Sequence, residues 1–262
     1  MELEFKQLLP WLSGLWWPFC RVMAMFSAAP MIGEAMVPVT VRVLLSLALA
    51  VVLMPISEST ALALSPWSLA GVVAAAEQAL LGFVLGLAFH LAMAAITVLG
   101  FLLSSQLGLS MAVMNDPMNG ASSDVVSGLL VMLCMLVFFS VDGHLLFVQV
   151  LGASFKAWPV GSGIARLSIE TVAYNLAWVF SAALLMALPV IFSTLVVQVG
   201  MGLLNRVAPS LNLFSLGFSL VTLFGLFMLT QMLAFVPGHY LRMTQQILEM
   251  IDHGLRSGVG HV

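Results

Sequence analysis

Ionisable side chains inside long apolar stretches are the residues of this sequence best placed to carry chemistry. Arg21, Glu77 and Asp142 each occupy such a stretch. Because a charge within a bilayer is energetically costly, residues of this kind usually serve ion or proton pathways, or pair with another helix. Glu77 lies early in its stretch, where its side chain can extend toward the membrane interface. We expect a helix-pairing or interfacial role for Glu77, with ion translocation as the alternative.

Asp142 and His144 flank Gly143, and the two side chains could form a proton relay or part of a metal site. Two ligands are too few for a closed metal site. The remaining histidines show no metal-binding spacing: His90, His239, His253 and His261. Gly143 favours a turn, so the sequence predicts a polar helix–turn–helix junction here and no metal.

Enzyme signatures are absent from the sequence, which contains no GxGxxG opening a helix, no P-loop, no GxSxG and no HExxH. The formal net charge is −3, and the eight Lys and Arg residues are scattered singly rather than gathered in a basic patch. We therefore expect a non-enzymatic protein with no catalytic residue, no cofactor and no nucleic-acid partner.

The elements that hold these residues are helices of the membrane class. Apolar residues make up 62% of the chain and charged residues 7%, whereas a soluble domain carries about 25% charged residues. Six apolar segments cover roughly 8–33, 39–56, 69–103, 125–151, 172–204 and 211–236. A spanning helix needs about 20 residues, so the third and fifth segments imply tilt, protrusion or a break within the run. Six crossings would place both termini in the cytoplasm by the positive-inside rule.

Proline and glycine positions predict where these helices bend or approach one another. Pro30 and Pro38 predict a turn or kink after the first segment, and Pro189 is expected to interrupt the fifth. Gly82 and Gly86 form a small-xxx-small pair at which another helix can pack closely. The predicted fold class is therefore all-α, a polytopic membrane-type helical protein with kinked helices and helical hairpins.

Apolar and helix-breaking residues are mixed in the stretch that separates the third and fourth apolar segments. Met111, Met114 and Met118 would share one face of a helix, but Pro117 makes a continuous helix unfavourable. Asp116 could instead cap a new turn that begins at Pro117. Methionine is flexible and adapts to varied surfaces. The residues alone leave two interpretations open, a re-entrant loop buried against its neighbours and a plug that closes a passage.

Four stretches of the chain carry a family resemblance. They are Arg21, Pro30, Pro38 and Arg42 near the N-terminus; 106–110 with Asp116 and Pro117; 142–145 with 158–162; and Arg206 through Asn212 to Phe218. In this order, and over about residues 20–240, they resemble the flagellar biosynthetic protein FliR family of the type III secretion export apparatus. The injectisome homologue of the same family is the near alternative.

The resemblance implies a subunit of a helical, cone-shaped export gate in the flagellar basal body, at the bacterial inner (cytoplasmic) membrane. It implies FliP-type and FliQ-type subunits as partners, with FlhB-type and FlhA-type components, membrane lipid and unfolded exported proteins as further partners. An FliP-like helical part would cover residues 1–165 and an FliQ-like helical hairpin residues 166–262. Because much of such a gate lies above the bilayer plane, apolar residues would contact neighbouring subunits as well as lipid.

The resemblance also implies that the internal loop, residues 108–122, projects into the channel as a plug. The expected plug residues are Gly108, Leu109, Met111, Val113, Met114, Asp116, Pro117, Met118 and Gly120. The expected polar or assembly residues are Arg21, Glu77, Asp142, His144, Arg206 and Asn212. Met111 and Met114 stand where family members often have Phe, which predicts a softer and more adaptable closure. An ion-coupled secondary transporter and a purely structural membrane scaffold remain the alternatives from other functional classes.

Overall fold

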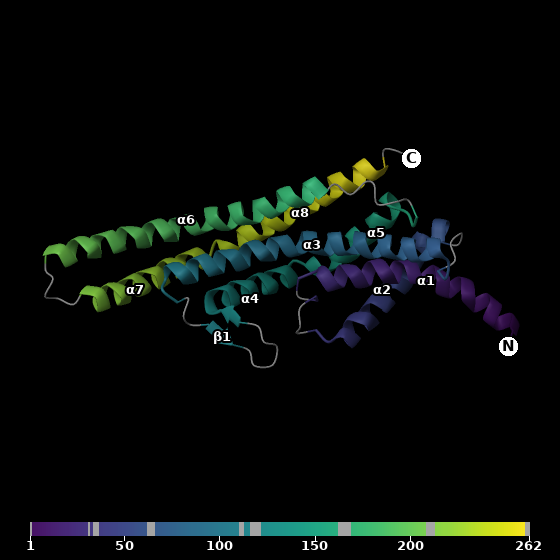
Figure 1. The fold of residues 1–262 in the computed structure, drawn as a ribbon, viewed down its shortest axis with the longest axis horizontal. Coiled ribbons are helices and arrows are strands. Elements are labelled where there is room, and N and C mark those ends of the chain that lie inside the picture. The colour runs from purple at the N-terminus through teal and green to yellow at the C-terminus, as the bar shows by residue number, and fades with distance from the viewer. Residues whose placement is uncertain are drawn as a thin grey trace. The chain divides into compact units, whose positions relative to one another are not determined.

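The computed structural model describes residues 2–30, 32–33, 37–61, 66–109, 113–115, 122–161, 169–207 and 213–259. Long helices form nearly all of this part of the chain (Figure 1). They are α1 (Glu2–Ala28), α2 (Val39–Ala61), α3 (Leu69–Gln106), α4 (Val125–Ser140), α5 (Gly143–Ala157), α6 (Ile169–Val207), α7 (Leu213–Leu233) and α8 (Val236–Val259). The predicted all-α, polytopic membrane-type fold is confirmed.

One small β-hairpin departs from the helical pattern. Strands β1 (Val113–Asn115) and β2 (Ser122–Asp124) pair antiparallel, with Val113 opposite Asp124 and Asn115 opposite Ser122. Each strand has only three residues, too few for the period-two alternation that identifies a strand in a sequence. The hairpin lies within the connection between α3 and α4.

The helices that could cross a membrane are fewer than the six apolar segments suggest. Among the described residues, four segments are long and apolar enough: Val39–Ile56, Leu69–Gln106, Ala177–Val207 and Leu216–Leu233. α4 and α5 make a fifth only if the pair, which is bent by 69°, counts as one broken span. α1 is not in this set, so the six expected crossings reduce to four or five.

Two helices are too long for a simple perpendicular crossing. α3 has 38 residues and α6 has 39, so each is about 57 Å long, nearly twice the ~30 Å hydrocarbon core. α6 continues through Pro189, which corrects the expectation that this proline interrupts the segment. Membrane-type helices tolerate an internal proline when neighbouring groups satisfy the freed carbonyl. A break within the apolar segment is therefore excluded for both helices. Each helix must instead tilt or protrude beyond the bilayer.

The chain divides into two compact units, each built from separate stretches. Unit 1 comprises Met1–His90, Phe138–Thr171 and Thr244–Val262, and unit 2 comprises Leu91–Val137 and Val172–Met243. The expected boundary between residues 165 and 166 lies outside the described residues and stays a prediction.

Within unit 1, α1 packs on α3 at two glycines. A Cβ added to Gly82 would lie 2.0 Å from the carbonyl oxygen of Arg21, and one added to Gly86 would lie 2.3 Å from that of Met25. Only glycine permits so close a backbone approach. The helix-packing role predicted for this pair is therefore confirmed. α2 in turn packs against α1 and α5.

Within unit 2, the start of α4 packs on α3 at a third glycine. A Cβ on Gly100 would lie 2.4 Å from the Cα of Ser127, and the Ser127 hydroxyl donates a hydrogen bond to the Thr97 carbonyl oxygen at 3.0 Å. Small residues at the contact and a hydroxyl bond across it are the usual means of joining membrane-type helices. This contact brings the two ends of the α3–α4 connection onto neighbouring helices.

α8 differs from the other helices because it is amphipathic. Its buried residues recur at helical spacing: Tyr240, Met243, Ile247 and Ile251. Arg242, Gln245 and Glu249 are exposed between them. None of the six apolar segments extends past residue 236, because hydropathy favours uniformly apolar stretches, whereas a search for the 3.6-residue period would have found this helix.

Candidate channel-closing site and buried polar cluster

The connection between α3 and α4 begins at a helix cap that requires glycine. Gly108 has a φ of 74°, and its N–H donates to the Ser105 carbonyl at 3.3 Å, while the Leu109 N–H donates to the Ser104 carbonyl at 2.9 Å. This pair of bonds is a Schellman cap, which satisfies two carbonyls that the helix end leaves without partners. The left-handed conformation favours glycine because it has no Cβ. α3 therefore stops at a defined residue.

The connection ends at an equally defined cap. Asp124 accepts hydrogen bonds from the Ser127 N–H at 2.9 Å, the Ser127 hydroxyl at 2.7 Å and the Val126 N–H at 3.4 Å. Burial would raise the pKa of Asp124, but the hydrogen bonds from the Ser127 hydroxyl and from the Val126 and Ser127 backbone amides outweigh it, so the pKa lies below its ordinary value. A carboxylate at this position also interacts favourably with the positive end of the α4 dipole.

The stem of the predicted plug lies between these caps. Val113 and Met114 belong to β1, whose pairing with β2 brings the two arms of the connection together. Gly108 and Leu109 belong to the cap of α3. Met111, Asp116, Pro117, Met118 and Gly120 lie outside the described residues. The structure thus describes the base and stem of this loop, and the plug role of its residues stays a prediction.

Three residues of α7 contact the start of the loop. The Thr222 hydroxyl donates a hydrogen bond to the Leu107 carbonyl oxygen at 3.0 Å. A Cβ on Gly225 would lie 2.0 Å from Cδ2 of Leu107, and one on Gly108 would lie 2.7 Å from the Phe218 ring. Thr222 and Gly225 are not among the residues predicted from the sequence; the available signal was a hydroxyl and a glycine three residues apart on one helix face.

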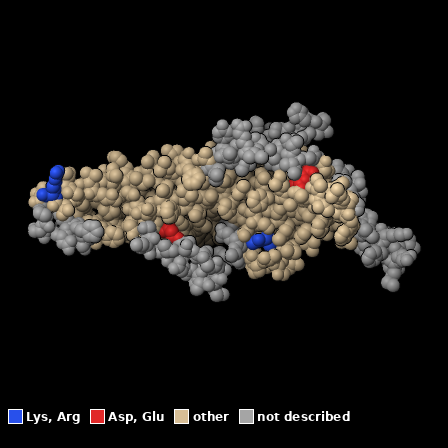
Figure 2. All heavy atoms as spheres, in the orientation of Figure 1, with Lys and Arg blue, Asp and Glu red and all other residues tan. Residues whose placement is uncertain are grey.

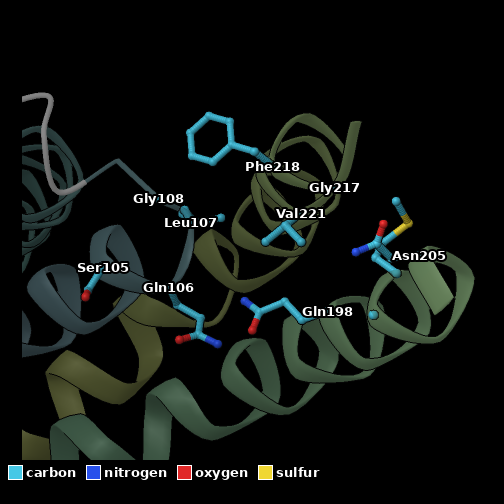
Figure 3. A pocket seen from close by; sticks show the side chains of 11 residues that line it. Ser105, Gln106, Leu107, Gly108, Gln198, Asn205, Gly217, Phe218 and Val221 are labelled. Atoms are coloured by element: carbon cyan, nitrogen blue, oxygen red, sulfur yellow. The ribbon is translucent and has the colours of Figure 1, made fainter. Parts of the chain in front are cut away.

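A pocket of about 420 Å³ opens beside this contact. Its lining comes from the end of α3, from α6 and from α7: Ser105, Gln106, Leu107, Gly108, Gln198, Met201, Gly202, Asn205, Gly217, Phe218 and Val221. Figure 3 shows the Gln106 and Gln198 side chains reaching toward each other across it, while Phe218 lies beside Gly108. None of the lining residues is charged, so the pocket presents amide groups over an apolar wall.

The most developed polar cluster of unit 1 surrounds Arg21, which is fully buried. Its guanidinium donates to Gln78 Oε1 from Nε at 2.9 Å and again from Nη2, to Ser154 Oγ at 3.0 Å and to the Trp158 carbonyl at 2.7 Å. The guanidinium carbon also lies 4.0 Å from the Phe155 ring centroid, a cation–π distance. Arg21 therefore joins α1 to α3, to α5 and to the segment after α5.

Glu77 supplies the negative charge near this cluster. Burial lowers the pKa of the Arg21 guanidinium to about 9, and the Glu77 carboxylate acts in the opposite direction. Arg21 is therefore still protonated at neutral pH, and Glu77 is buried at 4% exposure. The expected role of Glu77 was helix pairing or an interfacial position. Its burial does not fit the interfacial position, whereas helix pairing stays a prediction that fits a side chain enclosed by the protein.

Asp142 and His144 lie at the bend between α4 and α5. Asp142 has a φ of 56°, and its carbonyl accepts the Leu145 N–H at 2.9 Å, which starts α5. Gly143 is needed here, because a Cβ would lie 2.4 Å from the Phe138 ring. The predicted helix–turn–helix junction is confirmed. Both ionisable side chains are exposed, and the described residues contain no group of three metal-type ligands.

The last two polar candidates lie near the connection between α6 and α7. Arg206 is exposed in the last turn of α6, where a positive charge complements the helix dipole. Asn212 lies outside the described residues. Arg21 and Glu77 belong to unit 1, whereas Arg206 and the loop belong to unit 2. Among the described candidates, unit 1 holds the cluster around Arg21 and the turn at Asp142, and unit 2 holds the capped loop.

Residues 12–247 match the family described as bacterial export proteins, family 1. The chain belongs to this family. Flagellar biosynthetic protein FliR of Pectobacterium carotovorum subsp. carotovorum is 31% identical over 242 residues, which cover 92% of each chain. The FliR of Escherichia coli (strain K12) is 30% identical over 240 residues, or 90% of each chain.

A third relative of this export family has similar identity. The FliR of Caulobacter vibrioides is 30% identical over 240 residues, which cover 89% of this chain and 92% of the relative. The predicted resemblance to the FliR family is therefore confirmed, and it extends over both compact units. The match includes the Arg21 cluster and the capped α3–α4 connection.

Proposed function

We propose that this chain is a non-enzymatic subunit of the flagellar type III protein export gate and supplies the plug loop that closes its channel. The relatives that carry the name flagellar biosynthetic protein FliR support the flagellar role. The observation that carries the plug is the α3–α4 connection, which has a fixed cap at each end and a paired stem. Both described arms of the loop are thus anchored to helix ends.

Placement in the bacterial inner membrane, within the basal body, rests on the surface of the helices. Large apolar side chains are exposed along α6 and α7, for example Phe192, Leu203, Phe218 and Phe227. Figure 2 shows few charged residues among the described atoms on the visible face. Large apolar side chains exposed in this number need lipid or another subunit to cover them.

The length of two helices supports the proposal of partner subunits. α3 and α6 are nearly twice as long as the hydrocarbon core of a bilayer is thick. The apolar length that protrudes needs protein contacts, because water does not satisfy it. FliP-type and FliQ-type subunits in a cone-shaped helical gate would provide these contacts, with FlhB-type and FlhA-type components nearby.

Closure would depend on apolar exclusion of water and ions. A hydrophobic constriction blocks ions by dewetting. Methionine side chains at Met111, Met114 and Met118 would seal the channel at rest and then accommodate the varied side chains of an unfolded protein in transit. The energy for transport would come from other components, since Glu77 is engaged near Arg21 and Asp142 and His144 lie exposed at a turn.

Deletion of residues 111–120 tests this function. The gate, assembled with its partner subunits, would be reconstituted in vesicles loaded with K⁺. We expect the deleted gate to assemble with normal subunit ratios and to leak K⁺ at rest, while the intact gate stays closed. An equal leak from the two gates in vesicles would contradict the plug. A solitary chain that binds a solute and loses coupling in Glu77→Gln would instead support an ion-coupled transporter.

A further inference from the structure

Three uncharged amide side chains meet at the pocket of unit 2. Gln106, Gln198 and Asn205 line its volume of about 420 Å³, and Figure 3 shows the amides of Gln106 and Gln198 directed toward each other. None of the three side chains has a hydrogen-bond partner among the described residues. Gln198 and Asn205 belong to the membrane-class segment Ala177–Val207, and an amide in such a surroundings needs a partner other than bulk water. We call this site the amide pocket.

The amide pocket lies near one end of each helix that builds it. Gln106 is the last residue of α3, Asn205 lies in the last turn of α6, and Gly217 follows the first turn of α7. α7 has 21 residues and is about 32 Å long, which matches the ~30 Å hydrocarbon core of a bilayer. When α7 crosses the bilayer, its first turns therefore lie at one edge of that core, next to the polar headgroup region.

The wall beside the amides is apolar and continues along the outside of α7. Met201, Phe218 and Val221 line the pocket, and the Phe218 side chain is 59% exposed. Leu223 and Phe227 are also exposed farther along the same helix. A water-soluble ligand would leave this apolar surface uncovered, whereas a hydrocarbon chain would bury it. The pocket thus suits an amphiphile with a hydrogen-bonding end and an apolar chain.

A positive charge stands beside the pocket without a matching negative one. Arg206 lies one helical turn beyond Gly202, which lines the pocket, so both residues share one face of α6. Arg206 is exposed and has no ion-pair partner among the described residues, and no acidic residue lines the pocket. Basic sites between membrane helices bind anionic lipid headgroups. An uncharged peptide segment could bond to the amides equally well, but it would leave the Arg206 charge unmatched.

We propose that the amide pocket binds one anionic glycerophospholipid. The amide groups of Gln198 and Asn205 donate to its ester carbonyls, the headgroup phosphate pairs with Arg206, and the acyl chains follow the exposed side of α7. A volume of about 420 Å³ is typical of a small-ligand pocket and accommodates the glycerol–ester region, while the chains extend along the helix surface. This inference rests on the membrane placement proposed above and is independent of the plug.

Two glycines of α6 provide a matched test. Gly202 lines the pocket and Gly200 does not, and nothing lies within 4 Å of a Cβ at either position. The gate, purified in detergent with its partner subunits, would be titrated with phosphatidylglycerol, and bound lipid would be counted by native mass spectrometry. We expect Gly202→Leu to bind about fivefold less lipid or lower still, because the leucine fills the pocket, and Gly200→Leu to bind normally. Equal binding by the two variants would overturn the proposal.

Two further variants test the chemistry of the site and remain decisive if Gly202→Leu fails to assemble. Gln198→Leu should weaken phosphatidylglycerol binding about fivefold, because one hydrogen bond is lost. Gln231→Leu is its control, since Gln231 is exposed on α7 outside the pocket. Arg206→Gln should weaken phosphatidylglycerol about fivefold and leave phosphatidylcholine binding unchanged. Identical binding by Gln198→Leu and Gln231→Leu, or an unchanged lipid preference in Arg206→Gln, would contradict the assigned contacts.

The same measurements separate the lipid site from the proposed function. An unmodified gate that carries no phospholipid of any kind would contradict the membrane placement itself. A gate that carries phospholipid equally in all variants would overturn only the site. A changed subunit ratio in Gly202→Leu with an unchanged lipid count would show that a partner subunit fills the pocket, which also overturns the lipid. The K⁺ leak caused by deletion of residues 111–120 tests the plug and does not depend on any of these results.

Discussion

Arg21 and Gln78 connect α1 to α3 through two hydrogen bonds that converge on one amide oxygen, with Arg21 Nε 2.9 Å from Gln78 Oε1 and Nη2 donating to the same atom. The amide nitrogen of the same side chain lacks a hydrogen bond, because Gln78 Nε2 is buried and has no partner among the described residues. The guanidinium is thus the group that orients Gln78. Because both residues are buried at 0% exposure, their contact affects the stability of unit 1.

Gln78→Leu should destabilise the protein by roughly 2–4 kcal/mol, because a buried guanidinium loses its main acceptor. Gln78→Glu should be far better tolerated, since a carboxylate accepts both N–H groups and leaves no amide donor unpaired. Thermal unfolding in detergent, followed by loss of helical signal, measures both. Gln149→Leu, at an exposed position of α5, controls for the loss of an amide. Equal melting temperatures for Gln78→Leu and Gln149→Leu would contradict the structural role of this contact.

Gly82→Ala should separate α1 from α3. The added Cβ would lie 2.0 Å from the Arg21 carbonyl oxygen, a backbone atom that cannot move aside alone. We expect a loss of about 1–3 kcal/mol or more, although alanine is the better helix former. Gly128→Ala is the matched control because its Cβ would meet nothing within 4 Å. Denaturation of the two variants under the same conditions should therefore give shifts of opposite sign, and an unchanged Gly82→Ala would argue against this packing.

The sequence predicts the contacts that depend on short spacing and misses those that join distant segments. Gly82 and Gly86 are one helical turn apart, so their role as a packing surface can be read directly from the chain. Arg21 stands out as a charge in an apolar stretch, but its acceptor on Ser154 is 133 residues away. Nothing local marks that serine as a partner.

The same limit applies to the connection between α3 and α4. Its position and its helix breakers are evident in the sequence, because Gly, Pro and Asp interrupt an apolar pattern. The Thr222 hydroxyl that bonds Leu107 is 115 residues farther along the chain. A threonine in an apolar helix more often bonds to its own preceding turn, as Thr194 does with the Val190 carbonyl. The contact therefore requires the tertiary structure.

Acid should loosen the start of α4. The pKa of Asp124 is lower in the folded protein than its ordinary value of about 3.9, because its hydrogen bonds outweigh the effect of burial. Its contribution to stability is therefore complete above the ordinary value and is lost as the pH falls through the lower folded value. Hydrogen exchange at the Val126 and Ser127 amides should show less protection at the acid end of this range.

Asp124→Asn provides the control for that pH dependence. Asparagine caps a helix well but does not titrate, so the variant should keep most of its protection and lose the acid sensitivity of these amides. The Asp142→Asn variant changes a carboxylate that is exposed at the other end of α4 and should leave the sensitivity unchanged. Retention of the same acid response in Asp124→Asn would show that another group controls this helix end.

Asp142→Gly distinguishes a structural turn from a proton pathway. Asp142 has a φ of 56°, a conformation that costs a residue with a Cβ about 1 kcal/mol and glycine nothing. We expect the variant to fold with equal or slightly greater stability and to support flagellum assembly, whereas Asp142→Val should be destabilised by about 1 kcal/mol or more. Swimming motility in a strain that lacks the native chain measures the function, and thermal unfolding measures the stability. If the Asp142→Gly protein were stable but the cells could not swim, a purely structural role of Asp142 would be contradicted. The hypothesis of an ion-coupled transporter would then be supported.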